Sequence, residues 1–410
     1  MTLRKEVFSL KFDNIDKKKL FEILIPAMLA CMVFIGFAIS GHVAKRIDGV
    51  NPAVVSAEKD NGETKKSKSS KSGSVTLIAS GDNLINDTLI AAGQQENGKE
   101  DYSAFYANIK SYISSADIAV INQETVLGGT EFEYSGYPSY NTPWAVGEAA
   151  IDAGFDVFTC ATEHSMDMGF AGIQQQSRFF EEHPKIVHTG TYASEEASNS
   201  IAYFEKNHIT FALLNYTFGT NGVSVPDDKK WCVSVMDKKK ITEDVKSAQA
   251  QADVIIAFPH WGTEYSTAVS TYQQEYVSLF SDLGVDIVIG SHPHVLQRVE
   301  WVENKKTEKK TLVYYSLGNF VSYQTTLDQL CGGLAEIKID KTKNGIEISS
   351  AKLVPVVCWF SETDGEQDFS VYKLSDYTNQ IAKTHQLRDM GATPEYFSKL
   401  VKDTVSEEFL

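Results

Sequence analysis

Acidic and histidine side chains recur directly after short apolar segments of this 410-residue chain. The five places are Gly81-Asp82, Asn122-Gln123-Glu124, TEHSMDMG at 162–169, His260-Trp261-Gly262 and Ser291-His292-Pro293-His294. Imidazole binds Zn, Fe, Ni and Cu, whereas carboxylates suit harder ions such as Mn and Mg. A single histidine is more often a structural residue, but five such places in one chain predict a divalent-metal site. Two neighbouring ions there would stabilise the attacking and leaving oxygens of phosphoester hydrolysis.

The apolar segments that precede these groups have the composition of buried strands. β-Branched runs lie at 75–79, 118–121, 156–159, 211–216, 254–258, 287–289 and 312–315, and helical stretches lie at 142–153, 169–182, 242–252 and 271–283. This alternation predicts an α/β fold with layered sheets. In α/β sheets, ligands bind beyond the carboxyl ends of the strands. We therefore expect the acidic and histidine groups to meet at one such edge.

The last part of the chain has a different pattern. The segments 333–339 and 346–357 predict sequential antiparallel strands, so the sheets should be mixed rather than purely parallel. Residues 361–410 are more polar and predict a helical appendage. The expected fold is thus a set of layered mixed β-sheets flanked by helices.

The net charge of −16 is unevenly distributed along the chain. Residues 1–74 contain 13 Lys and Arg against 8 Asp and Glu, a balance of +5, and residues 75–410 therefore carry −21. An acidic body of this kind argues against nucleic-acid binding, which normally needs a basic face.

The N-terminal piece has the pattern of a membrane anchor. Residues 23–42 (ILIPAMLACMVFIGFAISGH) contain no Asp, Glu, Lys or Arg, and 20 helical residues span about 30 Å. The basic segment 1–22 precedes them, so the positive-inside rule predicts a single-pass protein of the cell membrane with a cytoplasmic N-terminus and an extracytoplasmic main domain. A signal peptide cleaved near Ala38-Ile39-Ser40 is the alternative, although the apolar run is long for one.

A Lys/Ser-rich linker at 43–74 is expected to tether the anchor to the body. The body contains four cysteines, and no CxxC spacing is present, which argues against a structural zinc site. Pairing is possible in an oxidising compartment, but four cysteines allow three disulfide connectivities and the sequence does not choose among them.

Six stretches of the body follow one another in a distinctive order over residues 75–325. They are Gly81-Asp82, Asn122-x-Glu124, AGFDVFTCATEHSMDMGFAGI (153–173), HWGTEY (260–265), LGVDIVIGSHPHVLQRVEWV (283–302) and YSLGNF (315–320). Together they resemble the CapA/PgsA family of poly-γ-glutamate capsule biosynthesis proteins, whose fold resembles the calcineurin-like metallophosphatases. The resemblance implies a metallophosphatase-like domain over 75–360, and membrane anchoring is also usual in this family.

Carried over by position, the resemblance implies a set of metal ligands. They are Asp82, Glu124, Glu163, His260, His292 and His294, for one or two divalent ions, with Mn or Zn expected. His164 resembles the histidine beside the reacting phosphate, where it would act as a general acid or stabilise charge. Asp167 would orient that loop, or it would cap the helix that starts near Gly169.

The sequence departs from the family pattern at three places, one of which is Asn86-Asp87, where the family often has a basic residue shortly after Gly-Asp. Glu163 stands where the family usually has Asn, which adds a negative charge at a bridging position and would favour harder ions or weaken catalysis. Leu84 replaces the histidine of the phosphatase Asp-x-His start. The aromatic residues Trp261, Tyr265 and Phe320 either line a substrate groove or pack in the core.

Three functions remain open from the sequence. The resemblance implies a membrane-anchored extracytoplasmic component of poly-γ-glutamate synthesis or export, which would act with other membrane components of a polyglutamate synthase complex. The alternatives are a metal-dependent phosphoesterase that acts on a cell-envelope substrate and a non-catalytic scaffold of the same fold. An anionic polymer or a phosphoester is the expected substrate class. A body with a charge of −21 would repel a polyanion, so direct binding would need metal ions or a local basic groove.

Overall fold

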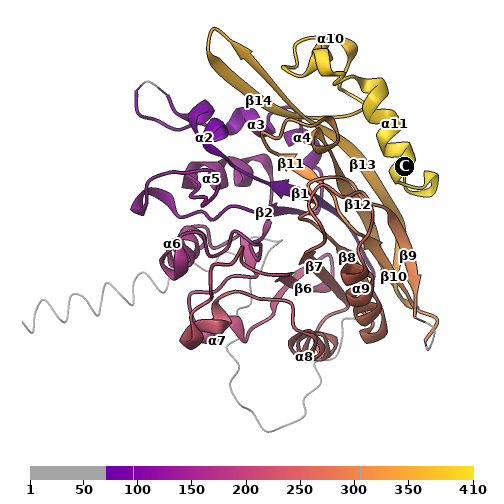
Figure 1. The fold of residues 1–410 in the computed structure, drawn as a ribbon. Helices are drawn as coiled ribbons and strands as arrows, with labels where there is room; N and C mark the ends of the chain where they lie inside the picture. The colour runs from indigo at the N-terminus through magenta and orange to yellow at the C-terminus, as the bar shows by residue number, and fades with distance from the viewer. Residues whose placement is uncertain (1–70, 96, 305–306) are drawn as a thin grey trace, which may run out of the picture. The chain divides into compact units, whose positions relative to one another are not determined.

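Two β-sheets lie at the centre of the protein, whose computed structural model describes residues 71–95, 97–304 and 307–410 (Figure 1). The first sheet has the order β14-β13-β12-β1-β2-β3-β4, with β11 paired to β1. Its strands are β1 (Gly73–Asn83), β2 (Ile118–Gln123), β3 (Val157–Thr159), β4 (Val187–Thr189), β11 (Asn319–Val321), β12 (Cys331–Thr342), β13 (Gly345–Thr363) and β14 (Glu366–Lys373).

The second sheet has the order β5-β6-β7-β8-β10-β9. Its strands are β5 (Ala202–Lys206), β6 (Ile209–Thr217), β7 (Val254–His260), β8 (Ile287–Ile289), β9 (Val299–Glu303) and β10 (Lys310–Tyr314). Both sheets combine parallel and antiparallel pairs. The expected α/β fold with layered mixed sheets is therefore confirmed.

The inner strands are apolar on both faces because each face is covered. Along β7, Val254 and Ile256 join the large core that also contains residues of the first sheet. The alternate residues Ile255 and Ala257 belong to a second core. Since successive side chains point to opposite faces, a strand packed on both sides reads as a continuous apolar run. This explains why the VIIAF segment at 254–258 was recognisable as a strand.

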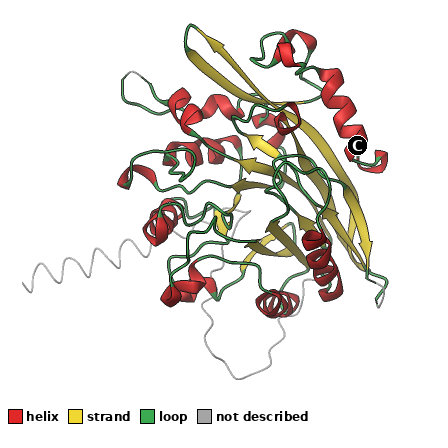
Figure 2. Cartoon of the chain, in the orientation of Figure 1, coloured by secondary structure: helices red, strands yellow, loops and turns green. Residues whose placement is uncertain are grey.

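Helices flank the two sheets, and the second core contains residues from α8 and α9 (Figures 1 and 2). The α-helices are α2 (Asp87–Gly93), α3 (Ser103–Tyr106), α4 (Lys110–Ile113), α5 (Trp144–Ala153), α6 (Gly169–Glu182), α7 (Glu195–Ser198), α8 (Lys238–Gln249), α9 (Thr271–Leu283), α10 (Asn379–Ala382) and α11 (Pro394–Thr404). A capping box between Ser270 and Gln273 starts α9, and Gly284 ends it in the left-handed conformation. The predicted helices at 169–182 and 271–283 have the expected bounds.

The C-terminal segment differs from the helical appendage expected over 361–410. β13 continues to Thr363, and β14 extends the first sheet to Lys373 before α10 and α11 follow. Buried Phe369 and Val371 alternate with more polar neighbours along β14, so the segment is a half-buried edge strand with low average hydropathy. Phe397 and Val401 of α11 belong to the same large core. The helices at the end of the chain are thus an integral part of the fold.

The N-terminal predictions lie outside the described residues. These are the basic segment 1–22, the apolar segment 23–42 and the linker 43–74 up to residue 70. Over the part of the chain that is described, no helix has the length and apolar character needed to cross a membrane. The four cysteines of the body, Cys160, Cys232, Cys331 and Cys358, are buried free thiols.

Candidate metal centre

The six predicted ligands converge at the carboxyl ends of strands from both sheets. Asp82 is the penultimate residue of β1, Glu124 follows β2 directly, and Glu163 lies four residues beyond β3. His260 ends β7, and a bridge from it to Ser291 aligns the segment after β8 that carries His292 and His294. The parallel register of these strands therefore brings together side chains that are more than 200 residues apart in the sequence.

Asp82, Glu124 and His294 form one group of potential ligand atoms. His294 Nδ1 lies 3.2 Å from Asp82 Oδ2, and His294 Nε2 lies 3.6 Å from Glu124 Oε1. Asp82 is fixed on its other side, where Oδ1 accepts a hydrogen bond from Asn122 Nδ2 at 2.9 Å. The group is buried, with relative exposures of at most 3%.

Glu163 lies between two further histidines. Its Oε1 is 2.7 Å from His292 Nδ1, and its Oε2 contacts His260 Nε2. His260 is oriented by Ser291, whose Oγ lies 2.7 Å from His260 Nδ1. Potential ligand atoms of Glu163, Glu264, His292 and His294 all lie within 4.8 Å of one another. His294 thus belongs to both of these ligand groups, as a residue between two neighbouring ions would.

The charges of this cluster fit a bound cation. Among the described residues, the cationic partners at ion-pair distance from Asp82, Glu124 and Glu163 are histidines, without any Lys or Arg. Both carboxylate oxygens of Glu124 are buried without a hydrogen-bond partner in the described structure, and the printed partners of the Glu163 oxygens are the two histidine nitrogens. Burying carboxylates in this way is costly unless an opposite charge neutralises them. A divalent ion with oxygen and imidazole ligands would supply that charge.

The surroundings of the two glutamates shift their pKa values in opposite directions. Burial, together with the charges of Asp82 and Glu163, raises the pKa of Glu124 well above its ordinary value. Burial also acts on Glu163, but His260 and His292 outweigh it and hold the pKa of Glu163 well below the usual range. Burial lowers the pKa of His260, so this ring favours the neutral form that metal ligation requires.

The backbone that carries the histidines is strained. His292 and His294 have φ values of 97° and 58°, in the left-handed region that non-glycine residues rarely adopt. Such conformations cost about 1–3 kcal/mol each and persist where the surroundings enforce them, often at functional sites. Here the strain turns both rings of the His-Pro-His segment toward the carboxylates.

A close approach of two glycines positions Asp82. The Asp82 amide donates to Gly318 O at 3.0 Å, and a Cβ on Gly81 would lie only 1.9 Å from that oxygen. Gly318 itself has φ 64°, a left-handed conformation that allows a tight turn before β11. The next residue, Asn319, places its Oδ1 3.0 Å from His294 Nδ1. The YSLGNF stretch therefore holds two of the predicted ligands, Asp82 and His294, in position.

His164 and Asp167 form a pair at the edge of the cluster. His164 Nδ1 is 2.8 Å from Asp167 Oδ2, and the same oxygen accepts the Tyr140 amide at 2.8 Å. α6 has no side-chain cap, so the orienting alternative for Asp167 agrees with the structure and the capping alternative does not. A ring nitrogen of His164 lies within 4.8 Å of ligand oxygens of Glu124 and Glu163.

Several residues near the cluster were not assigned a role from the sequence. Glu264 joins the ligand groups, and Tyr140 packs edge-on to His164 with ring centroids 4.6 Å apart. Exposed Phe218 lies 4.6 Å from the His292 ring. Glu264 had a signal, since it belongs to the HWGTEY stretch. Tyr140 and Phe218 lie in loops without a recognisable pattern.

The three aromatic residues considered for a groove divide between two roles. Trp261 and Phe320 are fully buried, and the indole of Trp261 donates to Tyr315 O at 3.0 Å. Tyr265 is 54% exposed and stacks near His294 at 5.9 Å. Core packing thus holds for Trp261 and Phe320, whereas Tyr265 lies at the rim of the cluster.

The region that contains this site matches a known family over residues 76–324, described as bacterial capsule synthesis protein PGA_cap. This match covers more than half of the chain, which therefore belongs to that family. Relatives include the PGA biosynthesis protein CapA of Bacillus subtilis (strain 168), 29% identical over 50% of this chain and 54% of the relative. The capsule biosynthesis protein CapA of Bacillus anthracis is 29% identical over 42% of each chain. The chain thus spans about half the length of the relatives it matches.

Solved structures with a similar course of the chain are more distant. The calcineurin-like phosphoesterase YfkN from Bacillus subtilis is 13% identical with a TM-score of 0.40, over 80% of this chain and all of that one. The 5'-nucleotidase from Candida albicans SC5314 is 10% identical with a TM-score of 0.37, over 80% of this chain and 56% of that one. Similarity at this level supports no conclusion about chemistry, which must come from the side chains themselves.

Proposed function

We propose that this protein takes part in the synthesis or export of a poly-γ-glutamate capsule and that it contains a divalent-metal centre. The proposal rests above all on one observation, the convergence of buried carboxylates and imidazoles inside the segment that matches the family, where five of the predicted ligands form shared ligand groups and His260 contacts Glu163. Asp82, Glu124 and His294 would hold one ion, and Glu163, His260 and His292 would hold a neighbouring one. Mn and Zn are the expected metals.

A bound ion would polarise a phosphoryl or carbonyl oxygen and neutralise developing charge. The residues around it would supply the remaining functions. Asp167 fixes the ring of His164, which is then placed to donate a proton to a leaving oxygen. Asn122 and Ser291 hold Asp82 and His260 in position. Tyr265 and Phe218 would contact the part of the substrate that remains outside the cluster.

This proposal is tested by measuring the capsule polymer on cells. Deletion of the gene should abolish surface poly-γ-glutamate, and the wild-type chain should restore it. The double variant His292→Ala/His294→Ala should fail to restore the polymer if the metal centre is needed. Unchanged polymer in the deletion strain would contradict a role in the capsule. Full restoration by the double variant would favour a non-catalytic scaffold.

A metal-dependent phosphoesterase is the second candidate, and the His164–Asp167 pair beside the ligand groups favours it. The purified full-length chain with Mn or Zn should then hydrolyse a phosphoester. His164→Gln should lower kcat by about 10²–10⁴-fold, as loss of a general acid does, while the bound metal stays. An absence of turnover over a broad phosphoester panel would exclude this candidate.

We also propose that residues 23–42 anchor the protein in the cell membrane, with the described domain outside the cytoplasm. The support is the uncharged run of 20 residues and the basic segment before it. Other membrane components of a polyglutamate synthase complex are the partners expected from this arrangement. Protease digestion of intact cells should remove the main domain. Protection of that domain until the membrane is opened would contradict the orientation.

A further inference from the structure

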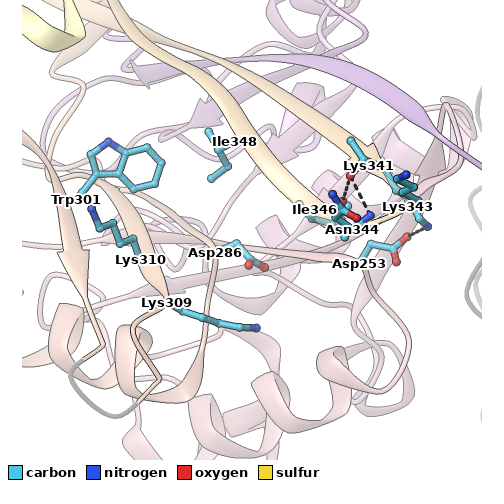
Figure 3. Close-up of a pocket in the computed structure, with 12 residues that line it drawn as sticks. Asp253, Asp286, Trp301, Lys309, Lys310, Lys341, Lys343, Asn344, Ile346 and Ile348 are labelled. Atoms are coloured by element: carbon cyan, nitrogen blue, oxygen red, sulfur yellow. Dashed lines mark hydrogen bonds and ion pairs between the residues drawn. The ribbon is translucent and has the colours of Figure 1, made fainter.

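A hollow lies at the end of the second sheet that is opposite the candidate metal centre. It has a volume of about 760 Å³ and is formed by the β12–β13 turn, the start of β10 and the residues that precede β7 and β8 (Figure 3). Ligand sites commonly have volumes of about 300–1,000 Å³, so a hollow of this size accommodates several units of a chain. We call it the lysine groove, because Lys309, Lys310, Lys341 and Lys343 line it.

The lysine groove is separate from the candidate metal centre. Asp253, which lines the groove, directly precedes β7, whereas His260 ends the same strand. At about 3.3 Å per residue, the two ends of β7 are about 20 Å apart. Asp286 precedes β8 and Ser291 follows it, with the same polarity. The groove and the metal centre thus occupy opposite edges of one sheet.

The cations of the groove are available to a ligand. Lys341 is occupied, since its Nζ is 2.6 Å from Asp253 Oδ2 and also donates to His208 O at 3.0 Å. The ammonium groups of Lys309, Lys310 and Lys343 are exposed and have neither ion pair nor hydrogen bond among the described residues. Figure 3 shows Lys309 and Lys310 on one side and Lys343 on the other, with Asp286 between them.

The two acidic residues of the groove weaken its positive potential only in part. Asp253 is paired with Lys341 and accepts the Thr210 amide at 3.0 Å. Asp286 accepts the Ile255 amide at 2.8 Å, so it is directed at the edge of the sheet. Lys341 thus neutralises Asp253, whereas the charge of Asp286 remains, so the four lysines and two aspartates of the groove leave a net charge of +2.

The groove also has an apolar part. Trp301, Ile346 and Ile348 line it and are partly exposed. Spaced ammonium groups beside an apolar strip suit a chain that carries carboxylates at intervals along a backbone with methylene groups. A small isolated anion would use neither the apolar strip nor the width of the groove.

We propose that the lysine groove binds an anionic polymer, a polycarboxylate chain, through Lys309, Lys310 and Lys343. This inference rests on the proposed function, since it gives that polymer a place on the protein. It also answers the charge problem of the sequence, because a body of −21 needs a local basic surface to hold a polyanion. The groove would hold the polymer about 20 Å from the metal centre.

The test is a binding titration with the full-length chain and a short, fluorescently labelled poly-γ-glutamate, followed by anisotropy at several salt concentrations. The triple variant Lys309→Gln/Lys310→Gln/Lys343→Gln should weaken binding about tenfold, as expected for three exposed charge pairs. The wild-type Kd should rise with salt more steeply than that of the variant. The matched control Lys185→Gln/Lys383→Gln/Lys402→Gln removes the same charge from exposed lysines outside the groove and should bind like the wild type.

Four results would overturn the inference. They are no binding by the wild type, unchanged binding by the groove variant, equal loss in both triple variants, and equally strong competition by short polyphosphate. The last result would indicate an unselective anion surface. The proposed function is tested separately, by measuring the polymer on cells. Suppose that the deletion strain lacks polymer, and that the groove variant binds poly-γ-glutamate normally and restores the polymer. This result would refute only the inference about the lysine groove. A deletion strain with normal polymer would refute the proposed function and leave the measured binding intact.

Discussion

At the scale of single residues, Glu163 is the most informative position of the candidate centre. It contacts two histidines with its two oxygens, and these contacts hold its pKa low despite burial. A neutral side chain of the same shape would keep the packing but remove the charge. A substitution at this position therefore distinguishes an electrostatic role of the carboxylate from a structural one.

We predict that Glu163→Gln weakens divalent-ion binding at least tenfold, because it removes a negative ligand shared by the neighbouring groups. Calorimetric titration of the chelator-treated chain with Mn²⁺ and with Zn²⁺ measures this. Glu148→Gln, which changes an exposed glutamate of α5, serves as the control and should bind like the wild type. Equal affinity of Glu163→Gln and the wild type would show that Glu163 is not a ligand.

The sequence identified the six candidate ligands because all of them lie in recognisable stretches directly after strands. The supporting residues were harder to recognise, since their roles depend on contacts across the fold. Ser291 fixes His260 from a different strand end, and Tyr140 reaches the His164 loop from 24 residues upstream. Neither contact leaves a periodic or compositional signal.

At the scale of elements, the end of β1 and the turn before β11 set the position of Asp82. Gly81 has no room for a side chain, because Gly318 O occupies that space. The strand ends therefore approach closely enough for the Asp82 amide to bond across. This contact links the first sheet to the stretch that also supports His294.

Gly81→Ala should lower the free energy of unfolding by about 1–3 kcal/mol, as overpacking does. It should also weaken metal binding, since β1 must shift with Asp82. Urea denaturation and metal titration measure the two effects. Gly219→Ala is the control, because its added Cβ meets no described atom within 4 Å. A variant as stable as the wild type would show that the strand ends adapt freely.

The predicted strand bounds agree best with the observed ones where a strand is covered on both faces. β7 and β8 read as unbroken apolar runs and were predicted with nearly the observed bounds. β14 and β5 were missed, since each is short and mixes a few buried residues with exposed or partly exposed polar ones. Such edge strands depend on pairing with a neighbour, which local composition does not encode.

At the scale of the whole molecule, the second sheet separates two chemically different surfaces. The carboxyl ends of β7 and β8 meet the first sheet at the acidic and histidine cluster. The lysine groove lies at the amino ends of the same two strands. The C-terminal helices close the large core from the side of β13. One of the buried groups in that region, His385, makes the stability of the fold depend on pH.

Burial lowers the pKa of His385 to about 4, from an ordinary value of 6.5. Its Nδ1 accepts the Leu387 amide at 3.0 Å, a bond that needs the neutral ring. The unfolded chain therefore binds an extra proton between these values, and stability falls as the pH is lowered from about 6.5 to 4. This one residue accounts for up to about 3 kcal/mol.

His385→Asn should flatten the pH dependence of unfolding in this window, measured by urea denaturation in the presence of chelator. His208→Asn changes an exposed histidine and should keep the wild-type slope. The change in slope is the decisive quantity, since either variant can also shift the overall stability. Identical slopes in the wild type and in His385→Asn would contradict a neutral buried ring.

The most direct test of the metal centre is the metal content of the full-length chain. After equilibration with Mn²⁺ or Zn²⁺ and removal of free ions, elemental analysis should find one or two ions per chain. The double variant His292→Ala/His294→Ala should lose these ions while its circular dichroism spectrum shows that it is still folded. A folded wild-type chain that retains neither ion would contradict the central claim that these buried carboxylates and imidazoles form a metal site.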